Sequence, residues 1–234
     1  MIRNFKLEKM KTIKSVTILL LLFIATCTVA FSQNGNEYKL ALSSGKLYVQ
    51  DLGDVEFSTS SSNEVIIVNK DHRSNQSDRA RGLKLINGLG LDDNTGIGLH
   101  IKKSDSEATL IQISRNSSSS FNIAVPKSVT IVYEHASVHG KTVHFKKVTN
   151  EIEVTTTHSG VRLEEVTGPM TISTVHGDIE GDFVSINQDN PISIFSTHGD
   201  IDLAIPSNSK AQLSLSTGWG EIYSDLDIEV NTSN

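Results

Sequence analysis

The chain has 234 residues, among them 21 basic side chains, 27 acidic side chains and one cysteine. Residues 1–32 hold five of the basic side chains and one of the acidic ones, so 16 basic and 26 acidic side chains remain in residues 33–234, a net charge of −10. A surface this acidic repels nucleic acid and anionic lipid, which argues against both as partners. A single cysteine also excludes internal disulfides and thiolate zinc sites.

The first 32 residues predict a secretory signal peptide. Basic side chains precede an apolar run over residues 16–30, and the small residues Ala30 and Ser32 stand at positions −3 and −1 of a cleavage site before Gln33. The run is shorter than the ~20 apolar residues of a spanning helix, and a polar segment follows it. We therefore expect no transmembrane helix after cleavage and an extracytoplasmic location, in the periplasm, at the cell surface or secreted.

Cys27 lies inside the predicted signal peptide and leaves a second mode of processing open. If the stretch IATC served as a lipoprotein signal, Cys27 would become the lipidated first residue of the mature chain. Thr26 is a poor residue for the position before it, so we favour cleavage after Ser32. The mature chain then has no thiol and no cysteine nucleophile.

Residues 33–234 predict one all-β domain. Short runs rich in Val, Ile and Thr alternate apolar with polar residues, and Gly, Asn, Asp and Ser separate the runs. Residues 77–98 are the exception, and we expect an irregular loop there with at most one helical turn. The pattern predicts a less regular β part over residues 33–128 and a repetitive part over residues 129–234. Clear strand candidates are KLYVQ (46–50), EVIIV (64–68), ATLIQIS (108–114), SVTIVYE (128–134) and EIEVTTT (151–157).

The repetitive part can be aligned on Gly177, Gly199 and Gly220, which are 22 and 21 residues apart. An acidic residue follows each glycine, and an isoleucine follows each acid. Four positions before the glycine also recur in each copy, and we call each set of equivalent residues a column. Two of these columns are apolar, one has hydroxyl side chains and one has ring side chains. In chain order the columns are Met170, Ile192 and Leu213; Ile172, Ile194 and Leu215; Thr174, Ser196 and Thr217; His176, His198 and Trp219; Asp178, Asp200 and Glu221; and Ile179, Ile201 and Ile222.

An earlier copy of the repeat fits the same columns with one adjustment. Ser159 stands between His158 and Gly160, which we interpret as a one-residue bulge. His139 and Gly140 resemble a still earlier and more degenerate turn. The apolar and hydroxyl columns of the copy at Gly160 are filled by Ile152, Val154 and Thr156.

A period near 20 residues predicts a solenoid of stacked β-coils, because each coil can bury its apolar face only against its neighbours. Successive coils would lie ~4.8 Å apart, the distance between paired strands. We expect Ile172, Ile194 and Leu215 to stack inside the solenoid. Glycine is expected at each corner because its backbone adopts shapes that other residues resist. The fold class predicted is therefore an all-β, β-helix-like stack of coils of about 20 residues.

These S/T-x-x-G-D-I units, with GPMTIST, NPISIFSTHGDIDLAIP and LSTGWGEIYSDLDI, resemble the bacterial secreted adhesin-like domain family of unknown function. The resemblance covers most of residues 33–234 and is strongest from Val129 onward. It implies a β-helix-like fold and an extracytoplasmic location, and it brings no catalytic residues. The chain departs from the pattern after Gly160, where Val161 replaces the acid. Since 14 residues follow Gly220, we expect a short or missing C-terminal cap.

The three histidines of the repeat, His158, His176 and His198, have two interpretations. On adjacent coils their imidazoles could converge on a metal ion, with Zn–N distances of ~2.1 Å. Alternatively, the rings stack into a ladder at the corner, with Trp219 as its last member. Trp is not a metal ligand, and no carboxylate is placed at ligand spacing by the sequence alone, so we favour the ladder.

The acidic column has a similar ambiguity. Asp178, Asp200 and Glu221 on adjacent coils would repel one another if they were buried. We therefore expect them to be solvated, with pairing to the histidines or to a cation such as Ca²⁺ as the alternatives. The candidates for a metal site, which we rank below the structural interpretation, are His158, His176, His198, Asp178 and Asp200.

Two further motifs match known sites only in part. His135 and His139 would chelate a metal together on a helix, but on the strand expected there they would lie ~13 Å apart. GLGLDDNTGIG (88–98) imitates a phosphate loop and a calcium loop. It lacks the GK[ST] of the first, and Lys103 stands where the second needs a bidentate Glu. We expect a turn-rich loop that could serve as an exposed binding element.

The functional prediction is an exported, non-enzymatic β-solenoid that serves in adhesion, as a scaffold or as an envelope interaction module. No motif such as GxSxG marks a nucleophile, and no cofactor is expected. The alternatives are a metal-binding envelope protein that uses the His and Asp columns, and a carbohydrate-binding β-helix, although one Trp and four Tyr are few for a glycan groove. The expected partner is a protein or a surface glycan, with end-to-end stacking of the chain on itself as a further option.

Overall fold

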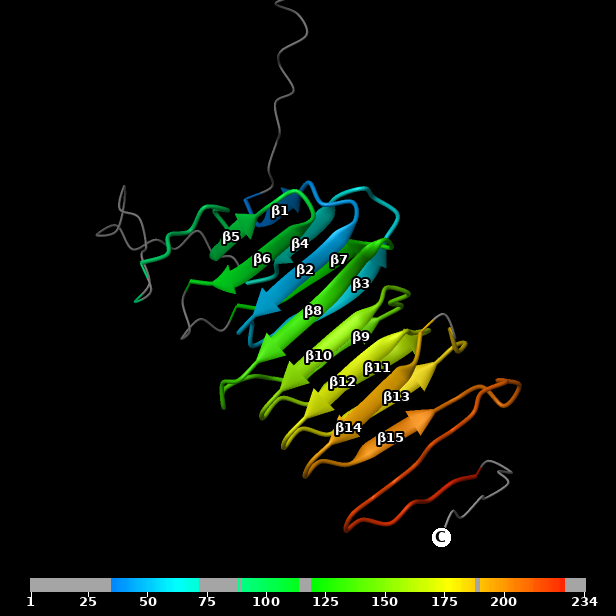
Figure 1. The fold of residues 1–234 in the computed structure, drawn as a ribbon. Helices are drawn as coiled ribbons and strands as arrows, with labels where there is room; N and C mark the ends of the chain where they lie inside the picture. The colour runs from blue at the N-terminus through cyan, green and yellow to red at the C-terminus, as the bar shows by residue number, and fades with distance from the viewer. Residues whose placement is uncertain (1–34, 72–87, 89, 114–118, 188–189, 226–234) are drawn as a thin grey trace, which may run out of the picture. The chain divides into compact units, whose positions relative to one another are not determined.

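The computed structural model describes residues 35–71, 88, 90–113, 119–187 and 190–225. These residues form 15 β-strands in two sheets that face each other across one apolar core (Figure 1). No helix within the described ranges is long and apolar enough to cross a membrane. The predicted all-β, solenoid-like fold class is confirmed. The predicted signal peptide lies outside the described residues.

Each coil of the solenoid contributes one strand to each sheet. The eight-stranded sheet has the spatial order β1 (Glu37–Leu40), β4 (Val65–Asn69), β7 (Phe121–Pro126), β3 (Val55–Ser60), β9 (Val143–Lys146), β11 (Val161–Val166), β13 (Ile179–Phe183) and β15 (Ile201–Ala204). The seven-stranded sheet has the order β14 (Ile192–Ser196), β12 (Met170–Thr174), β10 (Ile152–Thr156), β8 (Val129–His135), β2 (Gly45–Gln50), β6 (Glu107–Gln112) and β5 (Leu99–Lys103).

From β8 to β15 the chain winds as four regular coils, β8/β9, β10/β11, β12/β13 and β14/β15. Neighbouring strands are parallel, so that Ile172 lies opposite both Val154 and Ile194. Apolar and polar residues alternate in these strands, and parallel pairing therefore puts the apolar residues of every coil on the same side. The resulting columns form the core, in which Ile172 and Ile179 are 1% and 0% exposed.

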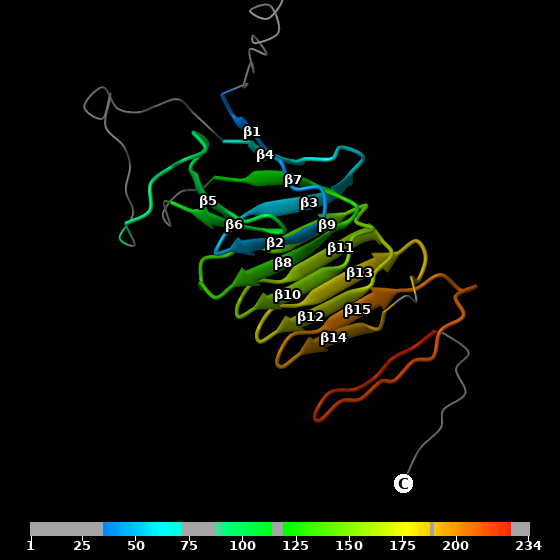
Figure 2. The same ribbon diagram turned by 45° about the horizontal axis from the view of Figure 1, so that its top comes forward.

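The N-terminal half adds two more coils, which are not stacked in chain order. Coil β2/β3 lies between coil β8/β9 and coil β6/β7: β2 pairs in parallel with β8 and β6, and β3 pairs in parallel with β9 and β7 (Figure 2). Antiparallel pairs of β1 with β4, β4 with β7 and β5 with β6 complete this end. Residues 33–128 were predicted to be less regular than the repeat. The stack of parallel coils in fact continues through them, but the coils are out of chain order and antiparallel strands are added.

Three large aromatic side chains of the core meet where coil β2/β3 packs against coil β8/β9. Phe57 stacks on Phe145 with 5.0 Å between ring centroids, and Tyr133 contacts Phe57 edge to face at 6.0 Å. The Tyr133 hydroxyl donates a hydrogen bond of 2.7 Å to the carbonyl of Leu52, which satisfies its polar end inside the core. Burial raises the pKa of Tyr133 well above its usual range. These contacts hold the out-of-order coil in its place.

The fifth copy of the repeat lies outside the stack. No strand pairing involves residues 206–225, and Figures 1 and 2 show this segment extending beyond β14 and β15. Leu215 is 54% exposed and Trp219 is fully exposed, and Ile222 also faces solvent. The structure thus differs from the prediction that Leu215 stacks inside and that Trp219 ends the histidine ladder. A terminal coil has a neighbour on one side only, so it buries less apolar surface on docking than an internal coil does.

Candidate functional site at the histidine corner

The clearest concentration of repeated polar side chains lies on three turns that lead from the seven-stranded to the eight-stranded sheet. We call residues 157–160, 175–178 and 197–200 together the histidine corner. Strand-like pairing continues through it, because the backbone amide of His176 donates to the carbonyl of Thr157 at 2.9 Å and that of His198 to the carbonyl of Val175 at 2.9 Å. The corner is therefore a continuation of the stack, with each turn fixed by the one before it.

The structure changes the alignment of the first turn of the corner. Strand β10 pairs with β12, and β11 with the start of β13, at the same offset of 18 residues. Ser159 therefore occupies the column of Gly177, and Gly160 that of Asp178, with no inserted residue at the turn. The predicted bulge at Ser159 is wrong. The register shifts inside β11 instead, near Glu165, which has a φ of 54°. Gly160 is therefore not equivalent to Gly177, and an alignment of the copies on these two glycines puts the additional residue of this coil at the wrong position.

Gly177 and Gly199 are required because neighbouring turns touch at these positions. A Cβ on Gly177 would lie 2.1 Å from the carbonyl oxygen of Ser159, and one on Gly199 would lie 2.2 Å from that of Gly177. Glycine was expected at these corners because of an unusual backbone conformation, but neither glycine has a positive φ. Glycine is needed here because the neighbouring turn lies too close for a side chain. Ser159 keeps a side chain in this column because the preceding turn has Gly140, where a Cβ would lie 2.2 Å from Ser159 Oγ.

The hydroxyl column anchors each turn. Thr156 Oγ1 donates to the carbonyl of Ser159 at 2.6 Å, and Thr174 Oγ1 donates to the carbonyl of Gly177 at 2.7 Å. In the next coil Ser196 Oγ accepts from the amide of Gly199 at 2.8 Å. The repeated Thr or Ser three residues before the glycine position thus has an architectural role.

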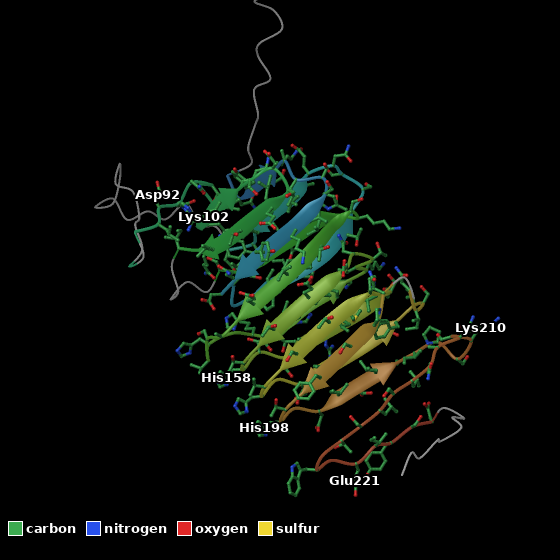
Figure 3. All side chains as sticks on the ribbon, viewed as in Figure 1. Asp92, Lys102, His158, His198, Lys210 and Glu221 are labelled. Carbon is green, nitrogen blue, oxygen red and sulfur yellow. The ribbon has the colours of Figure 1, made fainter. Side chains whose placement is uncertain are left out.

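The three histidines form the predicted ladder. His158 and His176 stack with ring centroids 5.1 Å apart and an interplanar angle of 13°, and His176 and His198 stack at 4.9 Å and 9°. All three are exposed, and Figure 3 shows His158 and His198 projecting from the same edge of the stack. Nearly parallel rings hold their ring nitrogens in separate parallel planes, so the nitrogen lone pairs do not converge on one point. Within the described ranges, no group of three or more His, Cys, Asp or Glu side chains is placed to hold a metal ion.

The acidic column links neighbouring coils through the backbone. Asp178 Oδ1 accepts a hydrogen bond of 2.9 Å from the backbone amide of Asp200. Both aspartates are exposed, in keeping with the expected solvation, and the hydrogen bond is a contact that the sequence did not predict. Glu221, the third member of the column, lies in the segment 206–225 outside the stack and contacts the hydroxyl of Tyr223.

A shallow polar depression of about 400 Å³ lies beside the corner. The side chains around it include charged residues of the neighbouring strands that belong to no repeated motif of the sequence. Arg162 forms an ion pair with Glu180 there, so part of its charge is already neutralised. The polar residues that line the depression include His144, His158, Arg162, His176, Asp178 and Glu180.

Behind the corner the structure places a buried histidine next to a buried serine. His135 Nδ1 and Ser159 Oγ are 3.1 Å apart, and the two residues are 3% and 1% exposed. The His135 ring stacks on Tyr133, with 6.2 Å between ring centroids. Burial lowers the pKa of His135, the charge of Asp51 opposes this shift and His158 adds to it. A serine and a histidine at this distance resemble a nucleophile and its base, but a substrate cannot reach a serine that is buried.

The two partial motifs from the sequence are explained by local structure. His135 is buried and His139 is exposed, so the H-x-x-x-H pair does not form one site. In the loop at residues 90–98, the Asp93 carboxylate accepts hydrogen bonds from the amides of Thr95, Gly96 and Gly98. Its oxygens are thereby used to shape a turn, as expected for a turn-rich loop. Residues 77–87 and 89 of the same predicted loop lie outside the described residues.

Stacked parallel coils, glycines where coils touch and ladders of like side chains define this protein as a β-solenoid. Residues 36–234 match a family model described as Toastrack DUF4097, and the chain belongs to that family. A comparison with curated proteins finds no match, and neither does a comparison with solved structures.

Proposed function

We propose that this protein is an exported, non-enzymatic β-solenoid that acts as an adhesion or scaffold module of the cell envelope. The observation that carries the proposal is the outer face of the seven-stranded sheet. Along β10, β12 and β14 this face displays small hydroxyl side chains on a flat, parallel array of strands. Its outward-facing residues in these strands are Glu153, Thr155, Thr171, Ser173, Ser193 and Phe195.

The two outer faces of the solenoid differ in how their charges are used. On the eight-stranded sheet, Arg162 pairs with Glu180, and Lys146 Nζ lies 3.5 Å from the carboxylate of Glu164. These pairs link adjacent coils, and the exposed side chains of Asp182 and Asp202 add negative charge to the same face. The seven-stranded face also carries an ion pair, with 2.9 Å between Lys46 Nζ and the carboxylate of Glu153, but none between β12 and β14 within the described residues. A partner that binds over β12 and β14 would displace water from hydroxyl groups there, which costs less than desolvating charges.

Phe195 gives this face an apolar anchor. It stands at the edge strand β14 and is 58% exposed. Exposed aromatic residues beside polar, adaptable ones are typical of surfaces where proteins bind. The same face has no row of aromatic side chains on β10 and β12, which favours a protein partner over a long glycan.

The non-enzymatic part of the proposal is supported by how the reactive side chains are used. Ser159 and His135 contact each other inside the protein. The exposed histidines stack on one another. Asp178 holds the backbone of the next coil. Each of these groups has a structural task that explains its presence in the repeat.

The experiment that tests the proposal is site-specific photocrosslinking in the native cell envelope. A photoreactive amino acid at Thr171 reports on the seven-stranded face, and one at Asp182 in the same coil reports on the opposite face as a matched control. We expect a discrete crosslinked protein from Thr171 that is absent from Asp182 and that persists after enzymatic removal of surface glycans. No crosslink from Thr171, or equal crosslinks from both positions, would contradict the proposal.

A further inference from the structure

The core of the solenoid is open at the last described coil. Ile192, Ile194 and Leu203 are only partly buried although their columns are interior in the preceding coils. Ile201 is 44% exposed, whereas Ile179, its neighbour in the same column, is 0% exposed. Strands β14 and β15 are also the edge strands of their sheets, so they offer unpaired backbone groups.

The segment that follows β15 exposes apolar residues that continue the open columns. Leu213 is 21 residues after Ile192, and Ile222 is 21 residues after Ile201, against 22 residues between the equivalent positions of the two preceding coils. Leu213, Leu215 and Ile222 are all exposed. Of the four columns that lack a cover at the open end, this segment supplies an apolar residue for three, and Ser224 stands at the position that follows Leu203.

The turn of this segment already has the hydrogen bond of a docked corner. The amide of Gly220 donates to Thr217 Oγ1 at 2.8 Å, as the amide of Gly199 donates to Ser196 Oγ at 2.8 Å. Trp219 stands in the column of His198 and is fully exposed. The segment therefore contains the corner hydrogen bond although it makes no strand pairing.

We infer that residues 211–225 dock on the edges of β14 and β15 of their own chain and form a fifth coil. Leu213 then lies against Ile192, Leu215 against Ile194, and Trp219 stacks on the outer side of the His198 ring. Backbone pairing satisfies the edge strands, and three of the apolar columns are closed.

Docking within the same chain is favoured over exchange between two chains by the length of the connection. Eight residues, 184–191, join β13 to β14, and eight residues, 205–212, lie between β15 and Leu213. The second connection begins to turn back at once, since the amide of Ser209 donates to the carbonyl of Pro206 at 2.9 Å. A short tether keeps the segment at a high effective concentration near its own edge.

Disulfide trapping tests the inferred register. In a Cys27→Ser background, Ser193→Cys with Ser214→Cys places two thiols on outward positions that become directly opposite on docking, ~4.8 Å apart and within the range of about 4.4–6.8 Å between Cα atoms that a disulfide spans. The control pair, Ser193→Cys with Ser207→Cys, places the second thiol in the connection that precedes the segment, where docking does not bring it opposite Ser193. We expect the first pair to form an intramolecular disulfide about tenfold faster or more. Equal rates would overturn the inference, and a crosslinked dimer would assign the docking site to a second copy instead.

Trp219, the only tryptophan of the chain, provides a test without cysteines. Docking predicts a blue-shifted emission and protection from a soluble quencher in the wild-type chain. Leu215→Asp should shift the emission to the red and increase quenching, because a charge cannot enter the apolar column, whereas Ser216→Asp on the outward side should change neither. Emission and quenching that are the same in the wild type and in Leu215→Asp would contradict docking. This inference does not depend on the proposed function, since neither experiment involves a partner.

Discussion

The carboxylate of Asp178 accepts a hydrogen bond from the backbone amide of Asp200, with 2.9 Å between Oδ1 and N. A side chain of one coil thus holds the main chain of the next, in the segment where the sequence repeats HGD. The glycine of that motif is needed because neighbouring coils touch at Gly177 and Gly199, and the histidine stacks its ring on that of the next coil. His-Gly-Asp in this protein is therefore a motif of coil stacking.

The hydrogen bond between coils predicts a graded effect of two substitutions at Asp178. Asp178→Ala removes the acceptor and should lower the free energy of unfolding by about 0.5–1 kcal/mol, since the site is exposed. Asp178→Asn keeps an oxygen acceptor and should cost less. Urea unfolding followed by circular dichroism measures both. Equal losses in the two variants would show that the charge, and not the hydrogen bond, is what matters.

Contact between turns predicts that Gly177→Ala is strongly destabilising. The new methyl group would lie 2.1 Å from the carbonyl oxygen of Ser159, which is backbone and cannot rotate away. We expect a loss of ~1–3 kcal/mol or more, the usual cost of overpacking. Gly218→Ala is the matched control, because a Cβ there has no neighbour within 4 Å and should be neutral. A Gly177→Ala protein with wild-type thermal stability would refute the account of the glycines.

The buried His135 predicts that stability depends on pH. Its pKa is lowered in the folded protein by burial, against a usual value near 6.5. The unfolded chain therefore binds a proton more readily, so the stability that neutral His135 contributes is present above about pH 6.5 and is lost as the pH falls below that value. His135→Gln should flatten the fall in the denaturation midpoint between pH 7 and pH 5. His139→Gln, at an exposed position, should leave the fall unchanged, and a fall that persists in His135→Gln would assign it to other groups.

Processing of the N-terminal segment predicts a defined mature chain. If residues 1–32 are a signal peptide, the protein recovered from the cell envelope or the medium should begin at Gln33, and mass spectrometry of the intact chain measures this directly. Cys27→Ser should be exported with the same N-terminus. A mature chain that begins with a lipid-modified Cys27, and that is lost in Cys27→Ser, would establish the lipoprotein alternative.

The regular half of the fold could be predicted from residue columns. Ile172 lies opposite Ile194 in adjacent strands, as its place in the repeat indicates. The ring stacking of His158, His176 and His198 follows from the same periodicity, because parallel in-register coils place like residues one strand spacing apart. The buried pair of His135 and Ser159 could not be predicted, since the two residues belong to different coils and to different columns of the repeat.

The sequence by itself determined the all-β class, the coil period and the identity of the interior columns, because period and alternation are local properties of the chain. Only the tertiary structure decided the order of the coils, since β2/β3 is placed between β6/β7 and β8/β9 by packing of Phe57 and Tyr133. It also decided the register at Ser159, which spacing between glycines cannot determine. Each of these depends on which surfaces meet in space, and a repeat specifies such contacts only where every coil has a neighbour on both sides.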